Sequence, residues 1–422
     1  MRIRHPGRAA PAVARPRRPG ETVRRTRRRR QGGDSRMKVP FASVRTIVRL
    51  VLALPLLVLL TAGCWDRREI EERTSVVALA IDRDRDNPQF ITLSVQIPIP
   101  IRIAGSGAGG GGGDGKNSVK VMSATGKTVV DAFQNLQKRL NQELFYGHTR
   151  IIAIGDDVAK EGLIHILDPF RRDPQIRRLL WPIIVKGNAL ELLNAVPTLE
   201  QIPTVFIMSL IENGAKSGRI PDVNLGDFFI DLSSASREAY MNYVEVNKND
   251  VKWCGVGVFR GDRMIGKLDE RETWNLIHLR EKKGGGNIVF PYENDPSKLV
   301  TLNTEFVSSK KNISFQDGKT IVRIHVELES NLLEKTFDMN LFQEASIKRL
   351  EQQAEKYLNE GAADLVRKLQ RQYKTDTLGI GSYIKAHHTS EWKRMDWERQ
   401  FPEADIRITY RIRVRNPGME LR

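Results

Sequence analysis

The stretch LFQEASIKRLEQQAEKYLNEGAADLVRKLQRQY, residues 341–373, decides the fold of the C-terminal part of this chain. Its apolar residues recur at steps of three and four, which is the spacing of one face of an α-helix. We therefore expect one long amphipathic helix with an apolar face that needs a partner surface. The residues on this face are Leu350, Ala354, Tyr357, Leu358, Leu365, Leu369 and Tyr373.

Strand patterns flank this helix on both sides. Asp317-Gly318 predicts a tight turn between the last two strands before the helix. Three strands, a helix and a returning strand predict an α+β domain over residues 286–422, with a mostly antiparallel sheet and one long helix. The predicted strands are 299–308, 311–315, 320–328 and 405–414.

Further upstream, strand and helix patterns alternate, which predicts a mixed α/β domain over residues 64–195. Residues 196–285 form a predicted middle domain of helices and loops with a hairpin over 253–268 and a short helix over 270–279. The mature chain is thus expected to be a mixed α/β protein of three domains, in the α+β class. The predicted upstream elements are strands at 74–81, 90–103, 119–123, 150–154 and 179–185, and helices at 128–140 and 158–167.

The positive charge of the chain is concentrated at its N-terminus. The 422 residues carry a formal net charge of +17, and residues 1–36 contain 13 Arg against one Glu and one Asp. Only +3 remains for residues 64–422, so the folded part lacks the positive field that non-specific nucleic-acid binding requires. Residues 1–36 contain few large apolar residues, and we expect a disordered extension upstream of a true start at Met37.

Residues 37–63 have the pattern of a lipoprotein signal peptide. Lys38, Arg45 and Arg49 precede 14 uncharged residues, which suit the apolar region of a secretory signal and are too few to span a bilayer. Small residues then lead into Cys64, as in a bacterial lipobox, although Thr61 stands where Leu is commonest. We expect a diacylglycerol on Cys64 to hold the mature protein at a membrane. The alternative is an ordinary secretory signal that happens to end before a cysteine.

The sequence contains no pattern that predicts catalysis, a cofactor or a metal. Gly110–Lys116 has the spacing of a phosphate-binding loop, but Asn117 follows where Ser or Thr is required. His387 and His388 lack the spacing of helical zinc ligands, and a packing role is expected for them. His148 is expected to be structural, since no nucleophile pattern lies nearby. We therefore expect a protein that is not an enzyme.

Two further sets of residues remain to be placed. Cys254 lies in an apolar run, where a buried and unreactive thiol is expected. Trp392, Trp397 and Phe401 recur within ten residues among charged side chains. Aromatic residues among charges are enriched at protein interfaces, so these three form a possible partner interface. The alternative is that they pack the end of a helix onto the terminal sheet.

Six segments, taken in order, resemble the Ger(x)C lipoproteins, the C subunits of bacterial spore germinant receptors. The resemblance covers residues 64–418 and leaves residues 1–36 without a counterpart. Its most specific part is GIGSYIKAHHTSEWKRMDWERQFPEADIRI, residues 379–408. The other segments are CWDRREI from Cys64, SATGKT from Ser123, FYGHTR from Phe145, DPQIRR from Asp173 and GVGVFRGDRMIGKL from Gly255.

The resemblance implies a nutrient receptor subunit that acts in spore germination. It implies assembly with an A subunit and a B subunit, a lipid anchor, and a place on the outer face of the spore inner membrane. It carries over no catalytic, cofactor-binding or metal-binding residue. The alternative is a solute-binding lipoprotein of a transporter, which would need two α/β lobes around a cleft.

Overall fold

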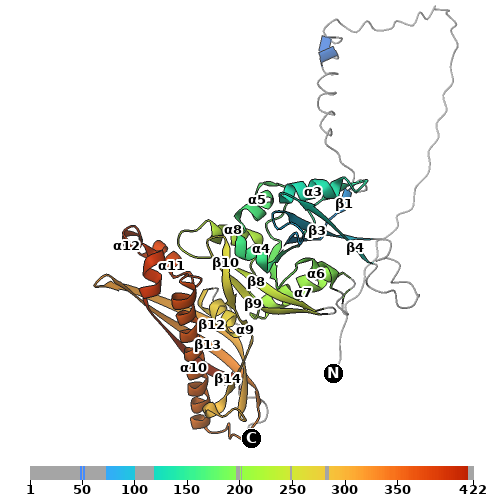
Figure 1. The fold of residues 1–422 in the computed structure, drawn as a ribbon. Helices are drawn as coiled ribbons and strands as arrows, with labels where there is room; N and C mark the ends of the chain where they lie inside the picture. The colour runs from blue at the N-terminus through green and yellow to red at the C-terminus, as the bar shows by residue number, and fades with distance from the viewer. Residues whose placement is uncertain are drawn as a thin grey trace, which may run out of the picture. The chain divides into compact units, whose positions relative to one another are not determined.

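The computed structural model describes residues 48–49, 51–52, 73–99, 118–195, 200, 202–247, 250–280 and 285–416. Cys64 and the predicted extension over residues 1–36 lie outside the described residues. The compact unit Arg68–Arg422 holds an eight-stranded sheet and a four-stranded sheet (Figure 1).

The larger sheet has a parallel centre and antiparallel margins. Its strand order is β10-β9-β8-β7-β6-β2-β3-β4, and β2, β6, β7 and β8 pair in parallel. The central strand β6, with the sequence IIAIG, is buried along its whole length, as expected for a strand that is covered on both faces. The bounds are β2 Ala78–Arg83, β3 Ile91–Pro98, β4 Val119–Gly126, β6 Ile151–Gly155, β7 Trp181–Val185, β8 Tyr240–Asn247, β9 Asp250–Arg260 and β10 Arg263–Leu268.

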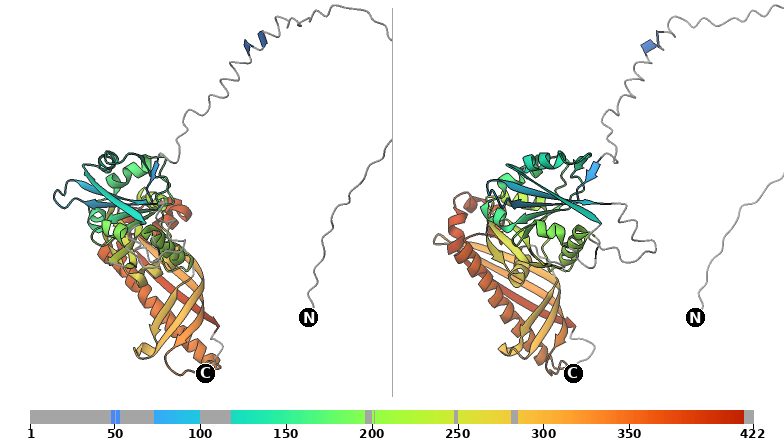
Figure 2. Two further views of the ribbon diagram at one scale, coloured as in Figure 1. Left: turned by 90° about the vertical axis from the view of Figure 1, so that its right-hand side faces the viewer. Right: turned by 45° about the vertical axis from the view of Figure 1, so that its right-hand side comes forward.

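Helices cover both faces of this sheet (Figure 2). Ile152 and Ile154 of β6 share one core cluster with α3 (Val129–Gln137), α4 (Asp156–Glu161), α5 (Ile164–Arg172) and α8 (Leu225–Leu232). Ile151 and Ala153 point to the other face, where α6 (Leu190–Asn194) and α7 (Pro203–Lys216) pack. The alternation of one strand between two clusters builds a three-layer domain. A short parallel pair, β1 (Arg73–Ser75) and β5 (Glu143–Phe145), forms a separate two-stranded sheet.

The second sheet has the order β11-β12-β13-β14, and only β13 and β14 pair in parallel. The turn at Asp317-Gly318 has positive φ at both residues, 47° and 74°, as the sequence predicts. The long helix is confirmed as α10 (Glu344–Arg367), which continues as a π-helix over Lys368–Tyr373. The strand bounds are β11 Asn287–Pro291, β12 Leu299–Gln316, β13 Lys319–Lys335 and β14 Asp405–Asn416.

The fold class is confirmed, with four local corrections. The predicted strand over 74–81 is split between β1 and β2, and the helix over 158–167 is two helices because Gly162, with φ of 127°, separates them. Residues 240–247 form β8 rather than helix or loop. The predicted strands at 299–308 and 311–315 are one strand, because Ser309 and Lys310 also pair with β13.

The domain boundaries at residues 195 and 285 stay predictions. Residues 64–195 and 196–285 both contribute strands to the larger sheet, so the first boundary falls between the neighbouring strands β7 and β8. After β10, the chain forms α9 (Glu270–Arg280) and then enters β11, and so passes from the larger sheet to the second sheet.

A buried carboxylate begins α6 and predicts a measurable pH dependence. Asp82 is 6% exposed and accepts hydrogen bonds from the backbone N–H groups of Ala189 (2.6 Å) and Leu190 (3.0 Å). Burial raises its pKa to about 6, although these hydrogen bonds oppose the shift.

The folded chain therefore holds a proton on Asp82 in a range where the unfolded chain has lost it. As the pH rises from about 4 to about 6, this group should remove up to about 3 kcal/mol of folding free energy. Asp82→Asn cannot titrate, so urea unfolding should show a smaller loss of stability between pH 4 and pH 7 than in the unmodified chain. Parallel stability curves for the two proteins would contradict this assignment.

Candidate functional site

The family-like segment Gly379–Ile408 lies where α10 ends and the chain returns to the second sheet. It forms three short helices, α11 (Ile380–His387), α12 (Thr389–Trp392) and α13 (Trp397–Gln400), and then enters β14. Short helices in series bury little surface individually, so their positions depend on specific contacts to the neighbouring elements.

The three residues of the proposed aromatic interface differ in how far the structure buries them. Trp397 and Phe401 are 5% and 1% exposed, and their rings meet edge to face at 5.7 Å within the core cluster that contains α10 and the second sheet. Trp392 is half-buried and packs against the same core. Because the side chains of Trp397 and Phe401 offer almost no surface, the packing alternative describes both residues.

Asp376 organises this packing, and sequence analysis missed it. Its carboxylate accepts hydrogen bonds from the backbone N–H groups of Ile380 (3.1 Å) and Gly381 (2.6 Å) and from Trp397 Nε1 (2.9 Å). Burial raises the pKa of this carboxyl above its usual range. A side chain at Gly381 would collide with the Trp397 ring, since its Cβ would lie 2.4 Å from that ring. One buried carboxylate thus begins α11 and fixes Trp397.

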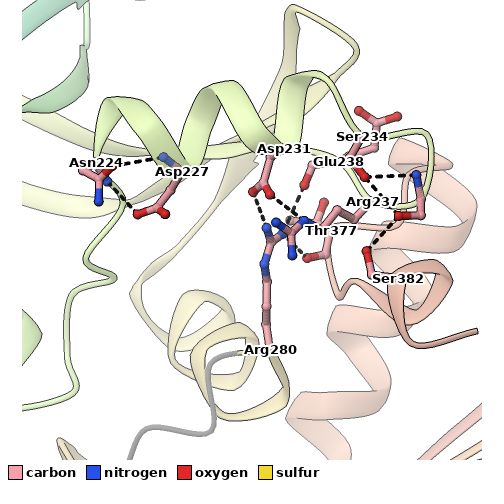
Figure 3. A network of polar contacts seen from close by, with 10 residues as sticks. Asn224, Asp227, Asp231, Ser234, Arg237, Glu238, Arg280, Thr377 and Ser382 are labelled. Carbon is pink, nitrogen blue, oxygen red and sulfur yellow. Dashed lines mark hydrogen bonds and ion pairs between the residues drawn. The ribbon is translucent and has the colours of Figure 1, made fainter. Parts of the chain in front are cut away.

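A second buried carboxylate, Asp231, lies at the end of α8 between two guanidinium groups (Figure 3). Arg280 of α9 pairs with it, and Arg237 Nε lies 2.6 Å from Asp231 Oδ1. Asp231 and the Arg280 side chain are only 5% and 12% exposed. Burial raises the pKa of Asp231, while the two guanidinium groups oppose the shift.

Arg280 also connects three segments that are distant in sequence. Its Nη1 donates to the backbone oxygens of Glu238 (3.1 Å) and Thr377 (2.8 Å), and its guanidinium lies 4.6 Å from the centre of the Tyr240 ring. Thr377 directly follows Asp376, the residue whose carboxylate fixes Trp397. We call Asp231, Arg237, Arg280 and the carbonyl groups of Glu238 and Thr377 the arginine junction.

Local signals place α8 for this role. Asn224 and Asp227 form a capping box, in which each side chain accepts from the other residue's backbone N–H, at 3.0 and 3.4 Å (Figure 3). Beyond the helix, the hydroxyl groups of Ser236 and Ser382 lie 3.0 Å apart and add a polar contact to α11. The arginine junction therefore joins the segment that leads into β8 of the larger sheet, α9 and the family-like segment.

The other residues considered from sequence lie apart from this junction. His148 Nδ1 lies 3.3 Å from Ser75 Oγ, the His387 ring packs at a tilt against Tyr383, and the His388 ring meets Phe315 edge to face. Cys254 is half-buried rather than buried, and its burial raises the pKa of the thiol, which disfavours the reactive thiolate. Within the ranges that the structure describes, no group of three or more His, Cys, Asp or Glu side chains is placed to hold a metal ion.

Two adjoining hollows lie beside α9. They have volumes of about 310 and 650 Å³ and share Arg219, Trp253 and Glu270. The smaller one is also lined by Arg271, Trp274 and Tyr357, together with three residues of β11. Aromatic rings beside guanidinium groups suit a polypeptide or another ligand with apolar and acidic parts. We call these two hollows the α9 groove.

The comparisons with known proteins agree with this architecture. Residues 66–246 match the family described as "Spore germination protein N-terminal domain", and residues 254–418 match "Spore germination B3/ GerAC like, C-terminal". The crystal structure of the GerBC protein has the same fold, with a TM-score of 0.54 and 21% identity over 80% of this chain and 97% of that chain.

Curated relatives support the same class. Spore germination protein YndF of Bacillus subtilis (strain 168) is 28% identical over 85% of this chain and 93% of its own length. Spore germination protein B3 of the same organism is 24% identical over 86% of this chain and 96% of its own length. The chain is therefore a spore germination protein of the GerAC-like class. Within that class, it belongs to the Ger(x)C family.

The arginine junction predicts a large stability loss on removal of Arg280. Arg280→Met keeps an apolar stem but removes one of the two charges that compensate the buried Asp231, which should cost about 3 kcal/mol in the free energy of unfolding. Arg172→Met, on an exposed surface pair with Asp168, is the control and should leave the unfolding midpoint unchanged. Equal urea midpoints for the two variants would refute the role of the junction.

Substitution of the two tryptophans of the family-like segment should lower the free energy of unfolding by different amounts in the same assay. Trp397→Ala empties a buried site and should cost about 3–5 kcal/mol, whereas Trp392→Ala should cost clearly less because Trp392 is half-buried. If Trp397→Ala left the melting temperature unchanged, the packing role assigned here would be wrong.

Proposed function

We propose that this protein is a membrane-anchored lipoprotein subunit of a nutrient germinant receptor. The observation that carries the proposal is that the two germination-family regions follow one another over residues 66–418. The first begins two residues after Cys64, the predicted lipidation site. A leader of this kind and a germination-family ectodomain together suit a protein held at a membrane surface by its first mature residue.

The proposed protein acts through assembly with the A and B subunits of the receptor, on the outer face of the spore inner membrane. Within the part of the chain that the structure describes, no helix is both long and apolar enough to cross a bilayer. The proposed anchor enters only one leaflet, so a signal that crosses the membrane is assigned to partner subunits. The proposed role is binding and assembly rather than turnover.

The architecture favours this proposal over a solute-binding lipoprotein. A solute-binding protein of two lobes would place a cleft between two α/β units. Here one part of the chain forms an eight-stranded sheet covered on both faces. The other part forms a four-stranded, mostly antiparallel sheet with one long helix. These two parts differ in topology, and they match two different family descriptions, an N-terminal domain and a C-terminal domain.

Replacement of Cys64 tests the anchor and the function together. Cys64→Ala should abolish incorporation of an alkyne-labelled fatty acid and release the chain from the membrane fraction, because the thiol is the predicted acylation site. Cys254→Ala is the matched control and should keep both. In spores, Cys64→Ala should reduce the nutrient response. Normal labelling and membrane retention of the Cys64→Ala chain would contradict the proposal.

A further inference from the structure

The two larger sheets have four edge strands, β4, β10, β11 and β14. An edge strand presents backbone N–H and C=O groups that a strand from another chain can pair with, so proteins commonly cover such edges. Three of these four edges receive side-chain hydrogen bonds from a neighbouring helix, and the fourth edge borders the α9 groove.

The edge of β14 is covered by the long helix. Side chains at four-residue steps along α10 accept from alternate N–H groups of the strand. Glu351 Oε1 accepts from Val414 (2.8 Å), Glu355 Oε1 from Ile412 (3.2 Å) and Asn359 Oδ1 from Tyr410 (2.8 Å). The helical period of 3.6 residues per turn places these three side chains in one row beside the strand. Another strand therefore cannot pair with this stretch of β14 without displacing them.

The edges of β10 and β4 are covered in the same manner. The hydroxyl of Tyr373, at the end of the π-helix, accepts from Lys267 N–H (3.1 Å) and donates to Lys267 C=O (2.9 Å). On β4, Arg139 Nη1 donates to the carbonyl oxygen of Ser123 (2.7 Å), and Asn135 Nδ2 donates to that of Thr125 (2.8 Å).

The edge of β11 differs from the other three. Gly286 C=O accepts from Thr304 N–H at 3.0 Å, and Tyr292 N–H donates to Lys298 C=O at 2.8 Å, in register with the β11–β12 ladder. Because antiparallel strands pair through alternate residues, the backbone groups of Asn287 and Val289 point away from β12. Among the described residues, no hydrogen-bond partner is found for the backbone groups of Val289, which is 50% exposed.

The α9 groove lies along this edge and has a definite chemical character. Asn287, Ile288 and Val289 line the 310 Å³ hollow together with Trp274 and Tyr357. An extended segment beside β11 would alternate its side chains, so every second one could enter this hollow.

The 310 Å³ hollow is lined by two arginines, Arg219 and Arg271, against one acidic residue, Glu270, and this balance favours an acidic partner. Within the described part of the chain, Arg219 and Arg271 have no carboxylate oxygen within 4.0 Å, although Arg271 stacks on the Tyr357 ring at 4.0 Å. The carboxylate of Glu270 is already paired with Lys252 at 3.5 Å. Two exposed guanidinium groups beside an apolar hollow are complementary to a carboxylate that neighbours an apolar side chain.

We propose that the β11 edge binds an extended segment of a partner receptor subunit by strand addition. The segment pairs with the backbone of Asn287 and Val289, inserts an apolar side chain into the 310 Å³ hollow, and places a carboxylate beside Arg219 and Arg271. The inference rests on the proposed function, because it assigns a surface to the assembly with the A and B subunits.

The test uses the full chain co-expressed with the A and B subunits and purified in detergent. Val289→Pro removes the outward N–H without breaking the β11–β12 ladder, whereas Val289→Thr keeps that N–H and is the matched control. Co-purification should fall at least about tenfold for Val289→Pro and stay unchanged for Val289→Thr. Arg219→Glu should weaken co-purification as well, with Arg172→Glu on α5 as its charge-reversal control.

Hydrogen exchange gives a readout that does not depend on a variant. The amide groups of Asn287 and Val289 should exchange at least about tenfold more slowly in the assembled receptor than in the chain alone. Equal exchange in both states, or equal co-purification of Val289→Pro and Val289→Thr, would overturn the β11 site and leave the proposed function standing. If the unmodified chain did not co-purify with either subunit, the proposed function itself would fail. Melting temperatures of the variants identify any loss that comes from unfolding.

Discussion

The arginine junction is the constraint on which the position of the family-like segment, Gly379–Ile408, depends. A buried carboxylate without a compensating charge is strongly destabilising, so Asp231 requires Arg280 and Arg237 to remain in place. The same guanidinium group holds the carbonyl oxygen of Thr377. That residue is bonded to Asp376, which begins α11 and fixes Trp397. One charge pair therefore determines where the most family-specific segment of the chain can lie.

The features that could be predicted are those with a local signal. The long helix follows from its apolar spacing, and the turn at Asp317-Gly318 follows from its residue types. β8 gave no such signal, because buried Asn242 interrupts its apolar pattern and is compensated by Pro221 and Trp253 from elsewhere in the chain. Asp231, Asp376 and Arg280 resemble solvated charges in the sequence, since the partners that permit their burial are remote. The aromatic residues near Trp397 were ambiguous for the same reason.

The buried charged groups in the part of the chain that the structure describes connect segments that are distant in sequence. The buried carboxylates bind guanidinium groups, backbone N–H groups or an indole N–H, which are the partners expected of structural charges. The α9 groove is lined by polar and aromatic side chains that a partner could contact. This distribution suits a germination protein whose proposed contribution is to position other subunits.

Tyr373 gives the long helix a mechanical role. Its ring lies against Gly266, where a Cβ atom would collide with that ring. Its hydroxyl forms hydrogen bonds with the backbone N–H and C=O of Lys267 in the larger sheet. The 24 residues of α10 before it form a rod about 36 Å long. A rod attached to one sheet along its length and to the other at its tip is a lever. A displacement of the N-terminal end of α10, near Glu344, would therefore be transmitted through Tyr373 to the edge strand β10.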